Sequence, residues 1–392
     1  MINGYELNII HHRMIYLDNN ATTMVAPEIK KQLYEACDIW GNASSMHESG
    51  RLANKAITEA RNSVASLIGA NSDEIMFTSG ATEANNTVLN IPEKGRILVS
   101  KVEHPSIIET CKFLLSKGRE VEFIDVDSSG IIRLDEYEKQ LKKGGVSLCS
   151  VMAANNESGA IQPFKEACAL AHKYGSLFHT DATQAIGKVD IDVHKDNIDY
   201  LSLSGHKFYA PKGCGALYIN SSSPFNTFMH GGHQEQGRRA GTYNTTAIYG
   251  LGLAADLVMK EGVEERERLW SLREYLREGI EKTIDDITIN SPQDMKQCLP
   301  GTLNVSFPGA EGESILLLLD NKGICVSTGS ACATGSLEPS YVLLAQGIPV
   351  ESAHGSIRFS LGRYNTKEEI DYVIEVLPSI ISRLRAWSTR QK

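Results

Sequence analysis

Apolar and polar positions follow two alternating patterns along the chain up to about residue 220. Helical spacing predicts helices over residues 28–40, 52–68 and 163–174, and Gly69 and Gly175 stand just past the ends of the second and third. Short, nearly continuous apolar runs lie at residues 74–78, 96–102, 121–126, 146–152, 176–179, 198–203 and 215–219. Apolar strands that alternate with helices are typical of a mostly parallel sheet covered on both faces.

The pattern changes after about residue 250. A charged helical stretch at 263–284 precedes a strand-like run at 302–307, an apolar run at 313–320 and a second strand at 356–361. Thr366 and Glu369 form a capping box before a last helix at 370–387, which Pro378 should kink or interrupt. We therefore predict a large α/β domain over residues 15–257 with a seven-stranded, mostly parallel sheet. A smaller C-terminal α+β domain is predicted over 258–392, with residues 1–14 packing nearby.

Composition and charge exclude several classes of protein. The 392 residues are 42% hydrophobic and 22% charged, which is ordinary for a globular protein. The net charge of −9 argues against a nucleic-acid partner, since binding to phosphate backbones needs a basic face. Neither an apolar run long enough for a membrane span nor a basic, apolar leader pattern is present, so we expect no membrane association. The eight cysteines form no CxxC pair, and we expect reduced thiols and a cytoplasmic location.

Polar residues follow five of the predicted strands, and in open α/β sheets ligands bind beyond the carboxyl ends of the strands. The small residues at 80–82 open a helix, whose free N–H groups suit a phosphate. Lys207 can form a Schiff base, Asp181 can pair with a protonated ring nitrogen, and His104 can stack on a ring or move protons. Singly, each feature has a commoner explanation: an ordinary turn, a solvated lysine, a helix cap and a structural histidine. Together they are what pyridoxal 5'-phosphate requires.

Several motifs carry a resemblance to a known family. The chain reads YLDNNATT at 16–23, TSGATE at 78–83, EHP at 103–105, NNE at 155–157, DATQ at 181–184 and SLSGHK at 202–207. These segments resemble class V aminotransferases, enzymes of pyridoxal-phosphate (PLP) fold type I. Three further motifs, HGGHQEQGRRAGT at 230–242, STGSAC at 327–332 and SIRFSLGR at 356–363, resemble cysteine desulfurases of the NifS/IscS type. The resemblance covers residues 15–387. The sequences of the motifs are closer to the NifS branch than to the housekeeping IscS branch.

The resemblance implies a set of cofactor contacts. Lys207 is implied to bond the cofactor aldehyde, while His104 stacks on the pyridine ring and helps to move protons. Asp181 is implied to bind the ring nitrogen and Gln184 the ring hydroxyl. The remaining cofactor-binding residues implied by the resemblance are Ala81, Thr82, Asn156, Ser204, His206 and, reaching the phosphate of the partner subunit's cofactor, Thr242.

The resemblance also implies the substrate, the reaction and the partners. Asn156 and Arg358 are implied to hold L-cysteine, Arg358 as a two-pronged clamp on the α-carboxylate. Cys332 is implied to be the nucleophile, which takes the sulfur as a persulfide and leaves L-alanine. The protein is then a sulfurtransferase and a homodimer with shared active sites, and it donates sulfur to an iron–sulfur scaffold or another acceptor. Thr328 and the pair at 333–334 depart from the family's usual residues, which leaves the choice of acceptor open.

Two other functions remain open at this stage. An aminotransferase on the same fold would not need Cys332, whereas activity on selenocysteine is compatible with every motif. A sulfur-relay protein that had lost PLP chemistry would lack Lys207 or Asp181, and both are present.

Two further features suggest a function that we do not expect them to have. His230 and His233 form an HxxH pattern, but the sequence suggests no third ligand, so we expect no metal site. Cys325 lies seven residues before Cys332 in an apolar strand, and we interpret it as a core residue.

Overall fold

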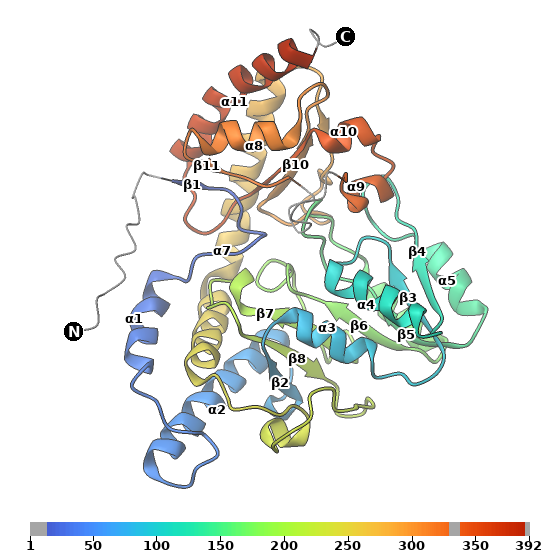
Figure 1. Cartoon of the computed structure of the whole chain (residues 1–392), viewed down its shortest axis with the longest axis vertical. Coiled ribbons are helices and arrows are strands. Elements are labelled where there is room, and N and C mark those ends of the chain that lie inside the picture. Colours follow the sequence, from blue (N-terminus) through green and yellow to red (C-terminus); the bar gives the residue numbers. More distant parts are fainter. Residues whose placement is uncertain (1–13, 329–337, 389–392) are drawn as a thin grey trace.

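The computed structural model describes residues 14–328 and 338–388, and its largest element is a seven-stranded sheet (Figure 1). The strand order is β2-β8-β7-β6-β5-β3-β4. β8 runs antiparallel to both of its neighbours, and the other pairs are parallel, so the predicted mostly parallel sheet is confirmed. The strands are β2 (Ile75–Thr78), β3 (Arg96–Ser100), β4 (Val121–Ile124), β5 (Val146–Ser150), β6 (Leu177–Asp181), β7 (Tyr200–Ser204) and β8 (Gly215–Ile219).

Helices cover both faces of this sheet, and a separate apolar cluster lies on each face. One cluster takes in α3 and α4, and the other takes in α2, α5, α6 and the first part of α7. α2 ends where Gly69 adopts a left-handed conformation with φ of 71°, as its sequence predicts. The helices are α1 (Pro27–Ala36), α2 (Glu48–Ile68), α3 (Ala81–Leu89), α4 (Pro105–Ser116), α5 (Leu134–Lys142), α6 (Phe164–Lys173) and α7 (Thr245–Thr283), with 3₁₀ turns η1 (Ser72–Glu74), η2 (Gly205–Lys207) and η3 (Gln234–Gly237).

The C-terminal segments build a second, smaller core. Its antiparallel sheet has the order β12-β10-β9, and β1 pairs in parallel with β11. Leu17 packs in the same apolar cluster as Leu276 and Phe359, so the start of the described chain shares this core. The elements are β1 (Ile15–Tyr16), β9 (Thr288–Ile289), β10 (Thr302–Ser306), α8 (Gly312–Asp320), β11 (Ile324–Cys325), α9 (Tyr341–Ala345), α10 (Val350–His354), β12 (Ser356–Ser360) and α11 (Lys367–Ser388).

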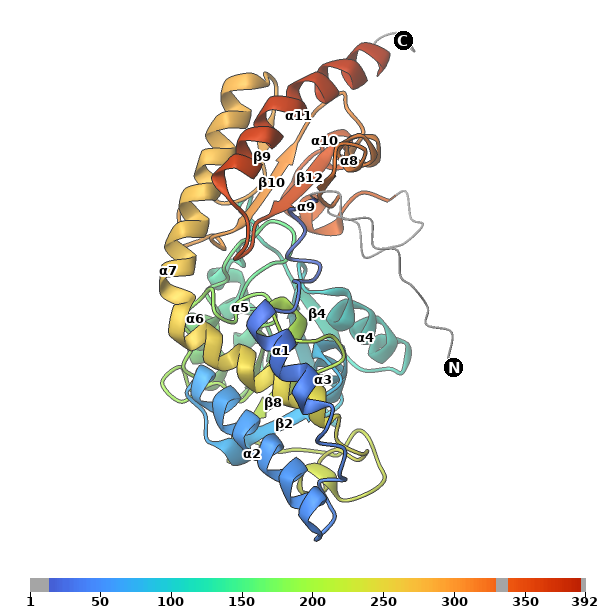
Figure 2. The same ribbon diagram turned by 90° about the vertical axis from the view of Figure 1, so that its left-hand side faces the viewer.

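The long helix α7 joins the two cores (Figure 2). It runs unbroken through residue 257, so the division of the chain at that residue stays a prediction. The packing expected of residues 1–14 falls almost wholly outside the described residues. Within the ranges 14–328 and 338–388, no helix has the length and apolar character needed to span a membrane.

The last helix confirms one local prediction and qualifies another. The Thr366 N–H donates to Glu369 Oε2 at 3.2 Å and the Glu369 N–H donates to Thr366 Oγ1 at 3.4 Å, which is the predicted capping box. α11 continues through Pro378 without interruption. Leu377 and Ile381 on either side are buried, and this packing holds the helix together where proline removes a backbone donor.

Candidate active site

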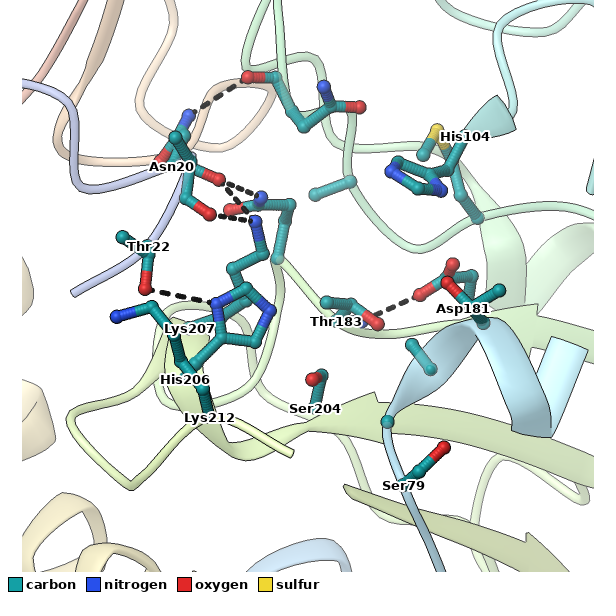
Figure 3. A pocket seen from close by; sticks show the side chains of 18 of the residues that line it. Asn20, Thr22, Ser79, His104, Asp181, Thr183, Ser204, His206, Lys207 and Lys212 are labelled. Atoms are coloured by element: carbon teal, nitrogen blue, oxygen red, sulfur yellow. Dashed lines mark hydrogen bonds between the residues drawn. The ribbon is translucent and has the colours of Figure 1, made fainter. Parts of the chain in front are cut away.

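A cavity of about 570 Å³ lies at the carboxyl ends of the central strands (Figure 3). It gathers ten of the residues predicted for the site, from segments spread over most of the chain. These are Ala81, Thr82, His104, Asn156, Asp181, Gln184, Ser204, His206, Lys207 and Arg358. Thr242 lines a separate cavity of about 230 Å³, and Cys332 lies outside the described residues.

Lys207 reaches the cavity from η2, directly after β7. Its Nζ donates to the backbone carbonyl oxygens of Asn20 at 2.6 Å and Ala21 at 2.7 Å. These two residues follow β1, which belongs to the small core, so the N-terminal segment reaches from that core to hold the lysine. Figure 3 shows Asn20 next to Lys207. The sequence motif at 16–23 therefore has a direct structural role at the site.

Two side chains near the end of β6, Asp181 and Gln184, also line the cavity. Asp181 is buried, and its Oδ2 accepts a hydrogen bond from Asn85 Nδ2 at 2.7 Å while its Oδ1 accepts one from the Thr183 N–H at 2.9 Å. Gln184 Nε2 donates to the Asn20 carbonyl at 2.8 Å, whereas its buried Oε1 has no hydrogen-bond partner among the described residues. This unpaired oxygen is available to a bound ligand.

The turn into α3 forms the third side of the cavity. Gly80 precedes the helix, whose first N–H groups have no partner within the helix and concentrate its positive dipole end. Gly215 on β8 permits the close packing of this turn, because a Cβ there would lie 2.5 Å from Leu203 O and 2.8 Å from Gly80 Cα. Ser204 lies opposite, with its Oγ 3.5 Å from where a Cβ of Gly80 would stand. The arrangement suits a phosphate.

Both histidines of the site are held neutral by their surroundings. Burial, reinforced by the Lys207 ammonium, lowers the pKa of His206 to about 4, and its Nδ1 lies 3.1 Å from Thr22 Oγ1. Burial also lowers the pKa of His104, although the negative charge of Asp181 opposes the shift. A neutral imidazole carries one N–H and one acceptor nitrogen, so each ring can donate one hydrogen bond and accept another.

Arg358 enters the cavity from β12 of the smaller sheet, almost completely buried. Its Nη1 donates to the Asn156 carbonyl at 2.9 Å and its Nη2 donates to Asp18 Oδ1 at 2.8 Å. Its Nε has no hydrogen-bond partner among the described residues. A carboxylate entering the cavity would find this unpaired donor beside a positive charge.

The chemistry of the walls fits pyridoxal 5'-phosphate. The α3 turn offers donors for a phosphate, and Asp181 offers a carboxylate for a ring nitrogen. Buried polar atoms of Gln184, Thr183 and Arg358 that line the cavity lack partners in the described part of the chain. Such atoms are normally paired in a folded protein, so their convergence on one cavity indicates a polar ligand.

Sequence reasoning missed three residues of this site. Asn85 and Asp18 hold Asp181 and Arg358 in place, and the side chain of Lys212 lines the cavity. Asp18 stands in the motif at 16–23 and Asn85 two residues past the motif at 78–83, but the residues alone did not reveal which polar side chains turn inward. No group of three or more His, Cys, Asp or Glu side chains that could hold a metal ion occurs among the described residues.

Comparisons with known proteins place the chain in a family. The class V aminotransferase family matches residues 15–373. A cysteine desulfurase IscS from Dictyoglomus turgidum is 46% identical over 387 residues, which cover 96% of each chain. A cysteine desulfurase from Nostoc sp. is 46% identical over 381 residues, which cover 96% of this chain and 94% of the relative.

Solved structures give the same result. A NifS-like protein from Rickettsia africae superposes with a TM-score of 0.87 at 33% identity and covers 94% of this chain and 99% of its own. A structure of SspA in complex with cysteine has a TM-score of 0.78 at 34% identity and covers 90% of this chain and 100% of its own.

The fold, the strand-end cavity and the family match together define a class V aminotransferase of PLP fold type I, as the sequence predicted. This family implies pyridoxal 5'-phosphate as the cofactor. At 46% identity over nearly its whole length, the chain belongs to the cysteine desulfurases of the NifS/IscS type.

Proposed function

We propose that the protein uses pyridoxal 5'-phosphate to convert L-cysteine to L-alanine and passes the sulfur to an acceptor protein through a persulfide on Cys332. The observation that carries this proposal is the convergence of Lys207, Asp181 and Arg358 on one cavity. A lysine for the aldehyde, a carboxylate for the ring nitrogen and a clamp for an α-carboxylate are what an amino-acid substrate of such an enzyme needs.

The proposed cofactor contacts are those that the family resemblance implies, and all of these residues except Thr242 line the cavity. Lys207 holds the cofactor aldehyde, Asp181 the ring nitrogen and Gln184 the ring hydroxyl. The α3 turn, with Ala81, Thr82, Ser204 and His206, would hold the phosphate, and His104 would stack on the ring. The cofactor supplies an electron sink for the bond changes at the substrate Cα.

Substrate binding rests on Arg358 and Asn156. Arg358 presents its unpaired Nε–H to the α-carboxylate of cysteine, while the Asn156 carbonyl and Asp18 prevent the guanidinium from turning away. His104 lies on the cavity wall, where it can exchange a proton with the reacting atoms. The Cys332 thiolate attacks the substrate sulfur, and the bond between sulfur and substrate carbon breaks as the new S–S bond forms.

Thr242 belongs to a shared site in a homodimer. It does not line the cavity that contains Lys207 in its own chain. Arg239, three residues before Thr242, pairs with Glu83 on α3 at 2.8 Å and so fixes this segment on the protein. We propose that Thr242 completes the phosphate site of the partner subunit.

The acceptor is proposed to be an iron–sulfur scaffold or another thiol-bearing protein, and the location to be the cytoplasm. The seven cysteines that the structure describes are free thiols, which is in keeping with a reducing compartment.

Two measurements on the purified protein test the proposal. Borohydride reduction followed by peptide mapping should place the cofactor on Lys207, and incubation with L-cysteine should release alanine in proportion to persulfide formed. A label on another lysine, or a turnover that yields no alanine, would refute it. Running the same assay with L-selenocysteine measures whether that substrate is also used.

A further inference from the structure

A buried asparagine joins the two residues proposed to hold the cofactor ring. Asn85 lies on α3 within one turn of the phosphate turn, and its side chain is completely buried. Its Nδ2 donates to Asp181 Oδ2 at 2.7 Å and to Ser106 Oγ at 2.9 Å. Ser106 Oγ lies 2.9 Å from His104 Nδ1. A continuous chain of hydrogen bonds therefore runs from Asp181 to His104.

The first half of this chain fixes the carboxylate. An amide NH₂ group has two hydrogens, and Asn85 directs one of them to Asp181. The Thr183 N–H donates to the other carboxylate oxygen at 2.9 Å. With one donor on each oxygen, the plane of the carboxylate is set, and each donated bond stabilises its negative charge. An ionised Asp181 is the form that keeps a ring nitrogen protonated.

The second half fixes the tautomer of the histidine. Ser106 Oγ accepts from Asn85, so its own hydroxyl hydrogen is available to His104 Nδ1. The Ser106 backbone N–H also donates to Nδ1, at 3.1 Å. Two donors directed at Nδ1 require that this nitrogen carry no proton. The neutral ring of His104 then has its hydrogen on Nε2.

Packing alone does not explain an asparagine at this position. The Oδ1 atom of Asn85 is buried and has no hydrogen-bond partner among the described residues, which destabilises a fold. A leucine of similar size would avoid that penalty but would remove both donated bonds. The benefit of the amide therefore lies in its two bonds, to Asp181 and to Ser106.

We propose that Asn85 is a positioning residue for the desulfurase reaction. It orients the Asp181 carboxylate toward the ring nitrogen of the cofactor, and through the Ser106 hydroxyl it directs a second donor at His104 Nδ1. The inference rests on the proposed function, since it assigns Asn85 a role only if Asp181 meets the cofactor ring.

The test compares Asn85→Leu with Asn86→Ala in the holoenzyme. Asn86 is a matched control on the same helix, because its side chain bonds Thr82 O and Thr110 Oγ1 and does not touch Asp181. The absorption of the bound cofactor is titrated with acid and base, and kcat and KM are measured with L-cysteine.

In Asn85→Leu the ring nitrogen should lose its proton more readily. Its positive charge then no longer lowers the pKa of the nearby Lys207–cofactor linkage, so the apparent pKa of the chromophore should rise by about one unit. We expect kcat to fall about tenfold or more, with little change in KM, because Arg358 is untouched. Asn86→Ala should leave the titration and both constants at the wild-type values.

Ser106→Ala tests the two halves of the hydrogen-bond chain separately, because it removes the hydroxyl that contacts His104 and leaves the bond between Asn85 and Asp181. It should leave the chromophore pKa unchanged, since Asp181 keeps its Asn85 bond, and it should lower kcat less than Asn85→Leu does, since the Ser106 N–H still donates to His104 Nδ1. If Asn85→Leu lowers only thermal stability and titrates like the wild type, the positioning role is refuted. If that variant does not fold, Asn85→Ala, which removes the same donor without adding a branched side chain, should raise the same pKa. An unchanged titration would again refute the role.

A different experimental result would refute the proposed function itself. A wild-type protein that binds the cofactor but forms no alanine refutes the desulfurase reaction, while the titration still tests the link between Asn85 and Asp181.

Discussion

Ser327 and Arg358 exchange two backbone hydrogen bonds. The Arg358 N–H donates to Ser327 O at 2.7 Å, and the Ser327 N–H donates to Arg358 O at 3.2 Å. Arg358 lines the cavity, and Ser327 stands five residues before Cys332 in the sequence. This isolated backbone bridge holds the backbone of the proposed substrate clamp against Ser327.

Replacing Arg358 with lysine should damage substrate binding while sparing the cofactor. Lysine keeps the charge but lacks the planar fork of donors. Loss of such a charge-assisted bond corresponds to a fall of about 10- to 100-fold in kcat/KM for cysteine. The affinity for pyridoxal 5'-phosphate, measured by fluorescence titration of the apoenzyme, should stay within about twofold of wild type. A variant with wild-type kcat/KM would remove Arg358 from the substrate site.

Replacing Cys332 with alanine should abolish sulfur transfer and leave cofactor binding intact. The variant should keep the wild-type absorption spectrum and its change on adding cysteine, but form neither persulfide nor alanine. Cys325→Ala is the matched control. Burial raises the pKa of the Cys325 thiol, which disfavours the reactive thiolate, so this variant should remain active. Mass spectrometry of the intact chain after incubation with cysteine reads out the persulfide, and its survival in Cys332→Ala would contradict the assignment.

Hybrid dimers should recover activity if Thr242 serves the partner's site. A Lys207→Ala chain and a Thr242→Ala chain are each expected to be weakly active or inactive alone. In a mixed dimer, one of the two composite sites contains both an intact Lys207 and an intact Thr242 contributed by the other chain. Differently tagged chains, co-expressed and purified over two affinity steps, should regain up to about half of wild-type turnover per dimer. Verified heterodimers without any gain would argue for independent sites.

The sequence predicted the scaffold better than the contacts within it. Continuous apolar runs located all seven strands, and strand-end position marked Lys207 and Asp181 because parallel strands end at one edge. Asn85 escaped notice because a polar residue in a helix looks alike whether it faces solvent or a carboxylate. The pair of Arg358 and Asp18 joins residues 340 positions apart, and no local pattern encodes such a contact. The long-range hydrogen bonds and ion pairs between buried polar groups of the site could therefore be found only in the folded structure.

A second buried carboxyl behind the site predicts how stability depends on pH. Glu103 at the end of β3 is completely buried, and burial raises the pKa of its carboxyl from 4.5 to about 8. Its Oε1 accepts hydrogen bonds from Ser100 Oγ and the Met152 N–H, both at 2.6 Å. These bonds favour the ionised form but do not outweigh the loss of hydration, so the folded protein keeps this proton at neutral pH.

The sign of the effect follows from counting protons. Between pH 4.5 and about 8 the unfolded chain has released the Glu103 proton while the folded chain retains it, so the folded state loses stability as the pH rises through this window. The loss is about 1.4 kcal/mol for each pH unit. Glu103→Gln has no proton to release, so the free energy of unfolding of the wild type should fall by a few kcal/mol relative to this variant from pH 5 to pH 8. Urea unfolding at both pH values measures the difference, with exposed Glu120→Gln as the control that should follow the wild type. Parallel pH dependences for wild type and Glu103→Gln would show that Glu103 is ionised in the folded protein.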